Sequence, residues 1–213
     1  MNEKLLILES AWSQCGRSRL TDRRSTTAIY KAGIDATNLN DRLVVLTRPL
    51  IARNFATDID NFLSLPANWK GINVIILSGH GYDKFLHEGE DGEIILTKSI
   101  EAYDGQISLL DINEIRYSMS RTILIFDCCN VGEHVHKVFK STGCFGVIGF
   151  AKEAIWLDST LFLQNVLMRF LIYGIFDMKH MKKDKVISIF TDMRKCGYKQ
   201  LMDSLAVKYR FRK

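Results

Sequence analysis

The sequence predicts an α/β domain in which helices cover both faces of a mostly parallel sheet, giving three layers. Runs of four or five aliphatic and β-branched residues, such as Thr122-Ile123-Leu124-Ile125-Phe126, are typical of strands buried on both faces. Segments with apolar residues at spacings of three and four, typical of amphipathic helices, alternate with these runs. With only 2 prolines and 14 glycines, the chain has no Pro- or Gly-rich linker, so we expect residues 1–213 to form one domain.

Strands and helices are predicted in alternating order along the chain. We expect strands at residues 5–8, 43–46, 74–77, 123–126 and 145–150. We expect helices at residues 26–39, 54–65, 132–140 and from 158 or 159 to about 174, then a last helix with one apolar face formed by Val186, Ile189, Phe190 and Met193. Polar residues 82–93 and short apolar runs at 94–96 and 107–109 predict strands outside the main sheet. Asp111 or Asn113 is a candidate cap for a helix through residue 119.

The longest apolar stretch, residues 161–176, is too short and too polar to cross a membrane. A spanning helix needs about 20 mainly apolar residues, whereas Gln164, Asn165 and Arg169 interrupt this stretch. We therefore expect a helix that is buried on both sides or forms part of a dimer contact, and no membrane partner.

Charge and cysteine content argue against nucleic-acid binding and against secretion. The net charge is +5, with basic patches at residues 17–24, 179–185 and 208–213, and no nucleic-acid-binding motif accompanies them. We therefore expect solvated faces or a solvated tail. The chain has five cysteines, an odd number, and its first residues lack the pattern of a signal peptide. These features predict free thiols in a reducing compartment and a cytoplasmic location.

Two predicted strand ends carry reactive side chains. Ser78-Gly79-His80-Gly81 follows the third strand, and Asp127-Cys128-Cys129-Asn130 follows the fourth. Because neighbouring parallel strands end at the same edge of a sheet, where open α/β sheets place their chemistry, we expect an imidazole beside a thiol.

This pair predicts nucleophilic catalysis. An imidazole can take the proton of a thiol, and the resulting thiolate can attack a carbonyl. The backbone N–H groups of Gly81 and Cys129 would form the oxyanion hole. The dipole of the helix predicted from Gly132 is expected to lower the pKa of the thiol.

Together the two motifs resemble those of the caspase-like cysteine peptidases. Ser78-Gly79-His80-Gly81 is similar to the family's histidine motif, and residues 127–132, Asp-Cys-Cys-Asn-Val-Gly, are similar to its cysteine motif, notably the Asp-Ser-Cys-His-Ser-Gly form of metacaspases. The interval of about 50 residues between His80 and Cys129 is also typical of the family. Trp156-Leu157-Asp158, ahead of an apolar helix, resembles bacterial relatives of caspase and separase. The resemblance implies a caspase-like three-layer α/β/α sandwich.

The resemblance further implies a cysteine endopeptidase that needs no cofactor, with His80 as general base and Cys129 as nucleophile. Asp127, two residues before the nucleophile, implies a pocket for an Arg or Lys side chain of a protein or peptide substrate. Asp158 would add a second carboxylate and Trp156 a neighbouring wall. Since no aspartate-rich activation linker is recognisable, we expect activation by a partner or by homodimerisation. The family context also implies a role in antiphage defence or programmed cell death.

Alternative interpretations remain open for single residues. The nucleophile is Cys128 instead of Cys129 if the alignment is off by one position. The other candidate site residues also have a purely structural interpretation, as turn, core, capping or ion-pairing residues: His80, Asp127, Trp156 and Asp158.

Other classes of function also remain open. The spacings of Cys128, Cys129, His134 and His136 do not suit a zinc site, so no metal is expected. One alternative is a catalytically inactive caspase-like module that binds a partner through its long apolar helix. A weaker alternative is a nucleotide- or signal-binding α/β domain, although no phosphate-binding motif is present.

Overall fold

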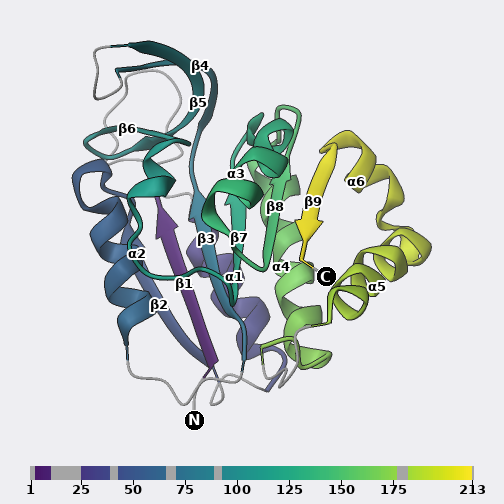
Figure 1. Ribbon diagram of the computed structural model, residues 1–213. Helices are drawn as coiled ribbons and strands as arrows, with labels where there is room; N and C mark the ends of the chain where they lie inside the picture. Colours follow the sequence, from purple (N-terminus) through teal and green to yellow (C-terminus); the bar gives the residue numbers. More distant parts are fainter. Residues whose placement is uncertain are drawn as a thin grey trace.

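A six-stranded sheet forms the centre of the molecule. The computed structural model describes residues 3–10, 25–38, 43–65, 71–88, 93–176 and 182–212. The strand order is β2-β1-β3-β7-β8-β9, with only the last strand antiparallel to its neighbour (Figure 1). The strands are β1 Glu3–Glu9, β2 Leu43–Pro49, β3 Asn73–Ser78, β7 Thr122–Asp127, β8 Gly146–Phe150 and β9 Val207–Phe211. The predicted strands all form, and the sheet is mostly parallel as expected.

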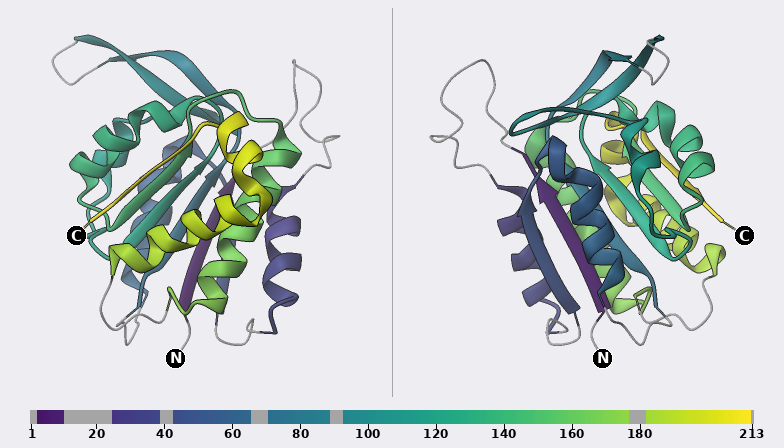
Figure 2. Two further views of the ribbon diagram at one scale, coloured as in Figure 1. Left: turned by 90° about the vertical axis from the view of Figure 1, so that its right-hand side faces the viewer. Right: turned by 60° about the vertical axis from the view of Figure 1, so that its left-hand side comes forward.

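Helices cover both faces of the sheet, as the two views in Figure 2 show. Strand residues alternate between the faces, so that Leu5 and Ile7 join one core cluster while Leu6 and Leu8 join the other. The first cluster is closed by α1 Thr26–Asp35, α4 Trp156–Ile172, α5 Lys183–Met193 and α6 Lys199–Ser204. The second is closed by α2 Phe55–Ser64 and α3 Val135–Thr142. The predicted three-layer arrangement is therefore confirmed.

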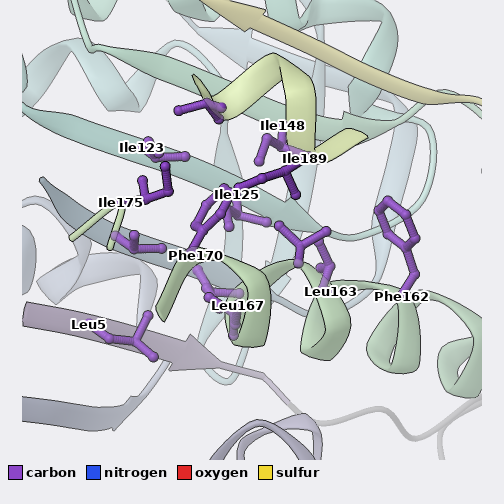
Figure 3. Close-up of a cluster of buried hydrophobic side chains, with 14 of the residues drawn as sticks. Leu5, Ile123, Ile125, Ile148, Phe162, Leu163, Leu167, Phe170, Ile175 and Ile189 are labelled. Atoms are coloured by element: carbon purple, nitrogen blue, oxygen red, sulfur yellow. The ribbon is translucent and has the colours of Figure 1, made fainter. Parts of the chain in front are cut away.

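The long helix α4 packs its apolar side against the sheet. Phe162, Leu163, Leu167 and Phe170 are fully or almost fully buried and face isoleucines of the central strands (Figure 3). Leu161 on the opposite side is 41% exposed, so the helix is not buried all round. Among the described residues, no helix combines the length and apolarity that crossing a membrane requires.

The start of α4 differs from the prediction. The helix begins at Trp156, and its N-cap residue is Ile155, which makes no side-chain capping hydrogen bond. Asp158 or Ser159 was the predicted cap, but both lie inside the first turn. The hydroxyl of Ser159 donates instead to the backbone carbonyl of Trp156 at 3.1 Å.

A small antiparallel sheet lies outside the main one, between β3 and β7 in the sequence. Its strands are β4 Gly81–Glu88, β5 Ile94–Ala102 and β6 Gly105–Ser108, in the order β4-β5-β6. Figure 1 shows it beyond the carboxyl end of β1. The predicted excursion is therefore confirmed, although the strands are longer than expected. The predicted helix through residue 119 is only a 3₁₀ turn, Asp111–Glu114, because the backbone becomes extended at Ile115, with φ −66° and ψ 119°. Asp111 accepts a hydrogen bond from the backbone N–H of Ser108 at 2.7 Å.

The end of the chain is an edge strand rather than the predicted solvated tail. After α5, a kinked turn at Arg194–Tyr198 leads into α6 and then into β9, which pairs with β8. Lys208 and Arg210 face solvent, whereas Phe211 is buried and Tyr209 stacks on Phe190 with ring centroids 4.4 Å apart. The alternation of charge and aromatic side chains is that of a half-buried strand. The basic patch at 17–24 and residues 179–181 lie outside the described residues.

Candidate active site

The two motifs meet at the carboxyl ends of neighbouring strands. β3 and β7 pair in parallel, with Ser78 opposite Asp127. Beyond the last pair, the backbone N–H of Gly79 donates to the carbonyl of Asp127 at 3.2 Å. His80 and Cys129 each lie two residues beyond this pair, so the expected arrangement of the strand ends is present.

The segment that bears His80 packs directly on the backbone of Cys129. A methyl group at Gly81 would lie 2.0 Å from the carbonyl oxygen of Cys129 and 3.0 Å from its nitrogen. Only glycine permits this approach, because no real Cβ atom comes so close to a backbone atom. On the other side, the N–H of Glu101 donates to the carbonyl of His80 at 2.8 Å. These two contacts hold the His80 backbone between β5 and the cysteine segment. The residue is half-buried.

The Cys129 thiol lies against the loop that follows β8. Its Sγ atom accepts a hydrogen bond from the N–H of Ala154 at 3.2 Å and is 3.6 Å from the carbonyl oxygen of the same residue. Burial raises the pKa of the thiol, and the Ala154 N–H offsets only part of this effect. The expected lowering by a helix dipole is wrong, since residues Val131–His134 form a 3₁₀ turn and the helix α3 starts only at Val135.

Cys128 faces the opposite way, into the core. It is 1% exposed and belongs to the apolar cluster that α2 and α3 cover. Burial raises the pKa of its thiol well above the ordinary value, with further contributions from Asp127 and Cys129. A buried, protonated thiol of this kind is a packing residue rather than a nucleophile.

Asp127 is completely buried at the base of the strand ends. Its Oδ2 atom accepts hydrogen bonds from the hydroxyls of Tyr30 at 2.5 Å and Ser78 at 3.1 Å. Burial raises the pKa of the carboxyl to about 6, although the hydrogen bonds from Tyr30 and Ser78 pull it down. The Ser159 proton is directed to the Trp156 carbonyl, and Oδ1 accepts no hydrogen bond from the described residues.

A chain of hydroxyls connects Asp127 to a second carboxylate. The Ser78 hydroxyl lies 2.9 Å from that of Thr26, which donates to Glu9 at 2.8 Å. Glu9 ends β1, opposite Ser78 in the sheet, and also accepts from the N–H of Thr26 at the start of α1. Glu9, Thr26 and Tyr30 were not predicted from the sequence as site residues. Their signal was weak, although Glu9 ends a predicted strand and Thr26 begins a predicted helix.

Trp156 and Asp158 occupy the first turn of α4, which follows the loop that touches the thiol. Both are half-buried, and the Trp156 indole nitrogen has no hydrogen-bond partner among the described residues. The predicted pocket roles of Trp156 and Asp158 stay predictions.

The described part of the chain contains no group of three His, Cys, Asp or Glu side chains close enough to hold a metal ion. His134, which follows the cysteine motif, is half-buried, and burial lowers the pKa of its imidazole.

Comparison with known proteins identifies the fold. No protein-family model matches the sequence, and no curated protein matches it. Among solved structures, the fold is similar to that of a secreted C11 cysteine protease from Bacteroides thetaiotaomicron in complex with an irreversible peptide inhibitor, with a TM-score of 0.51 and 10% sequence identity. The match covers 93% of this chain and 60% of that one. The chain therefore has the caspase-like α/β/α fold that its two motifs implied.

Proposed function

We propose that this protein is a cysteine endopeptidase that cleaves after Arg or Lys. The observation that carries the proposal is the packing of Gly81 on the backbone of Cys129. This contact sets the histidine segment beside the cysteine segment at the edge where α/β folds place their chemistry. The likeness to a C11 cysteine protease supports the same reaction class.

The reaction follows from the two side chains. The His80 imidazole takes the proton of the Cys129 thiol, and the thiolate attacks the carbonyl carbon of the scissile peptide bond. The N–H groups of Gly81 and Cys129 are the candidate donors to the oxyanion. When the C–N bond breaks, His80 gives its proton to the leaving amine and a thioester remains. Water, deprotonated by His80, then hydrolyses the thioester and releases the acid.

The preference for basic residues rests on Asp127. Its carboxylate is fully buried and accepts hydrogen bonds from two hydroxyls, while Oδ1 accepts none within the described part of the chain. A buried carboxylate is costly unless it is paired, and a guanidinium or ammonium group from the substrate would pair it. In this proposal Trp156 and Asp158 line the same substrate site.

The test uses fluorogenic peptides with Arg, Lys or Asp at the cleaved position. We expect the wild-type chain to hydrolyse the Arg and Lys peptides, and the His80→Ala and Cys129→Ala variants to lose about 1,000-fold or more of kcat/KM. Turnover that survives in both variants contradicts the proposed dyad. Turnover of the Asp peptide alone contradicts the role of Asp127.

A second candidate, the inactive partner-binding module, is favoured by the state of the thiol. Sγ is held by both backbone groups of Ala154, and burial raises the pKa of the thiol. An arginyl electrophile distinguishes the two: labelling of Cys129 supports the peptidase, whereas neither labelling nor turnover supports the module.

The biological setting belongs to the same proposal. The resemblance to metacaspases and bacterial caspase relatives suggests a cytoplasmic enzyme in antiphage defence or programmed cell death. We expect an activating partner or homodimer to open the contact between Cys129 and Ala154. Measuring turnover as a function of protein concentration tests homodimer activation, since specific activity then rises with concentration.

A further inference from the structure

One strand outside the main sheet contacts both catalytic segments. The N–H of Glu101 in β5 holds the carbonyl of His80, as described above. Three residues earlier on the same strand, the Lys98 ammonium donates to the carbonyl oxygen of Asn130 at 2.7 Å. Asn130 directly follows Cys129, so β5 is bonded to both ends of the dyad.

Lys98 is buried although it carries a charge. Its side chain is 8% exposed, and its ammonium also bonds Asp83 and Glu133 at 2.9 Å each. Burial lowers the pKa of Lys98, but the hydrogen bonds to Asp83 and Glu133 outweigh this effect and the net shift is upward. The two carboxylates are 58% and 62% exposed and need no partner in water, whereas the Asn130 carbonyl is the neutral backbone group that the ammonium fixes.

The Asn130 backbone has a defined turn conformation. Its φ angle is 62°, in the left-handed region, which asparagine adopts more readily than other non-glycine residues. Its N–H donates to the carbonyl of Lys152 at 3.3 Å. Lys152 and Lys98 therefore hold Asn130 from two sides, and together they fix the turn that aims the Cys129 side chain and N–H.

We propose that Lys98 is a positioning residue that holds the nucleophile turn through the Asn130 carbonyl. This inference rests on the proposed peptidase function. Because Lys98 acts on the reacting geometry and not on the substrate side chain, its loss lowers kcat and leaves KM nearly unchanged. A misplacement of about 1 Å in a reacting group can cost roughly 100-fold in rate.

The experiment compares Lys98→Met and Lys98→Arg with the wild type. Lys98→Met keeps the stem and removes the charge, and we expect kcat to fall about 10- to 100-fold with KM within about twofold. Lys98→Arg retains donors, so we expect a loss of only about threefold. If Lys98→Met fails to fold, Lys98→Gln replaces it, because its shorter, uncharged side chain does not reproduce the ammonium contact: a lower kcat at constant KM supports the proposal, and an unchanged kcat overturns it.

Lys4 provides a matched control. It is another buried lysine, 3% exposed, whose ammonium bonds the backbone carbonyl of Phe62 at 2.8 Å, but it lies near the amino end of β1, away from the dyad. Lys4→Met should lower the melting temperature and leave kcat within about twofold of wild type. An equal loss of kcat in Lys4→Met and Lys98→Met would overturn the positioning role, as would a rise in KM with unchanged kcat.

A second measurement separates this proposal from the function on which it rests. The rate of alkylation of Cys129 by chloroacetamide, followed by peptide mapping, reports the geometry of the turn without requiring peptide turnover. Absence of turnover in the wild type, together with absence of Cys129 labelling by the arginyl electrophile, contradicts the peptidase. An alkylation rate that Lys98→Met changes by more than about threefold still supports the positioning role, and an unchanged rate overturns it.

Discussion

Cys128 and Cys129 are adjacent in sequence, yet they have opposite environments. Cys128 packs in the apolar core at 1% exposure, while Cys129 is only partly buried and contacts the loop before α4. The difference arises at the end of β7, where successive side chains point to opposite faces and the chain then turns away from the sheet. One position of register therefore separates a packing thiol from a candidate nucleophile.

The largest expected effect tests this comparison directly. Cys129→Ala should abolish turnover of Arg and Lys peptides, a loss of about 1,000-fold or more. Cys128→Ala should keep kcat/KM within about threefold and lower the free energy of unfolding by about 1–2 kcal/mol, because it leaves a small cavity. Peptide hydrolysis and urea unfolding of both variants provide the two readouts. Loss of turnover in Cys128→Ala alone would show that the nucleophile lies one position earlier.

The second prediction concerns the contact that brings the histidine segment to Cys129. Gly81→Ala introduces a methyl group 2.0 Å from the Cys129 carbonyl oxygen, so one of the two backbone segments must move. We expect kcat to fall about 100-fold and the free energy of unfolding to fall by about 1–3 kcal/mol.

Gly105→Ala is the matched control for this prediction. Gly105 begins β6, and a methyl group there meets no atom of the described residues within 4 Å. Its activity and stability should stay close to those of the wild type. Equal activity of Gly81→Ala and wild type would show that the close packing is not needed for catalysis.

The sequence predicted the parts of the fold that local patterns encode. The run Val74-Ile75-Ile76-Leu77 and its counterpart before Asp127 are apolar at every position, which is typical of a strand covered on both faces. Glycine and polar residues after each run marked the strand ends. Because parallel strands end at the same edge, these two signals were enough to place His80 near Cys129.

The features that were not predicted from the sequence depend on contacts between residues far apart in the chain. β9 carries lysine and arginine at its exposed positions, so its strand character shows only once Tyr209 and Phe211 are seen against Phe190. Tyr30 looks like an ordinary core residue of a helix until Asp127 lies at 2.5 Å from its hydroxyl. Lys98 lies two residues after the apolar run 94–96 and looks like any surface lysine of a strand. No pattern in the sequence predicts that its ammonium bonds the carbonyl of Asn130, 32 positions away.

The third prediction extends the comparison by one position, to Asp127. Asp127→Asn should lower kcat/KM for Arg peptides about 100-fold and have little effect on the matching citrulline peptide, because only the charged side chain needs the carboxylate. The ratio of kcat/KM for the two peptides is the measurement. An Asp158→Asn variant shows whether the second carboxylate shares the role.

The same substitution should also change how stability depends on pH. The pKa of Asp127 is about 6 in the folded protein and near 3.8 when unfolded, so the folded state holds the proton more tightly. The contribution of Asp127 to the free energy of unfolding is therefore complete below about pH 4. It is lost as the pH rises through 6, and the total loss is about 3 kcal/mol. The wild type should show this loss in urea unfolding, and Asp127→Asn should not. Parallel curves for the two proteins would contradict the shifted pKa.

The smallest expected effect concerns the hydroxyls that keep Asp127 ionised. Removing a donor raises the pKa of the carboxyl further, so the preference for Arg over citrulline should begin at a higher pH. Because the Tyr30 bond is shorter and lowers the pKa more than the Ser78 bond, Tyr30→Phe should shift this onset by about one pH unit and Ser78→Ala by less. The same dyad acts on both peptides, so its contribution cancels in the ratio. An onset that neither variant moves would mean that the recognising carboxylate is another residue.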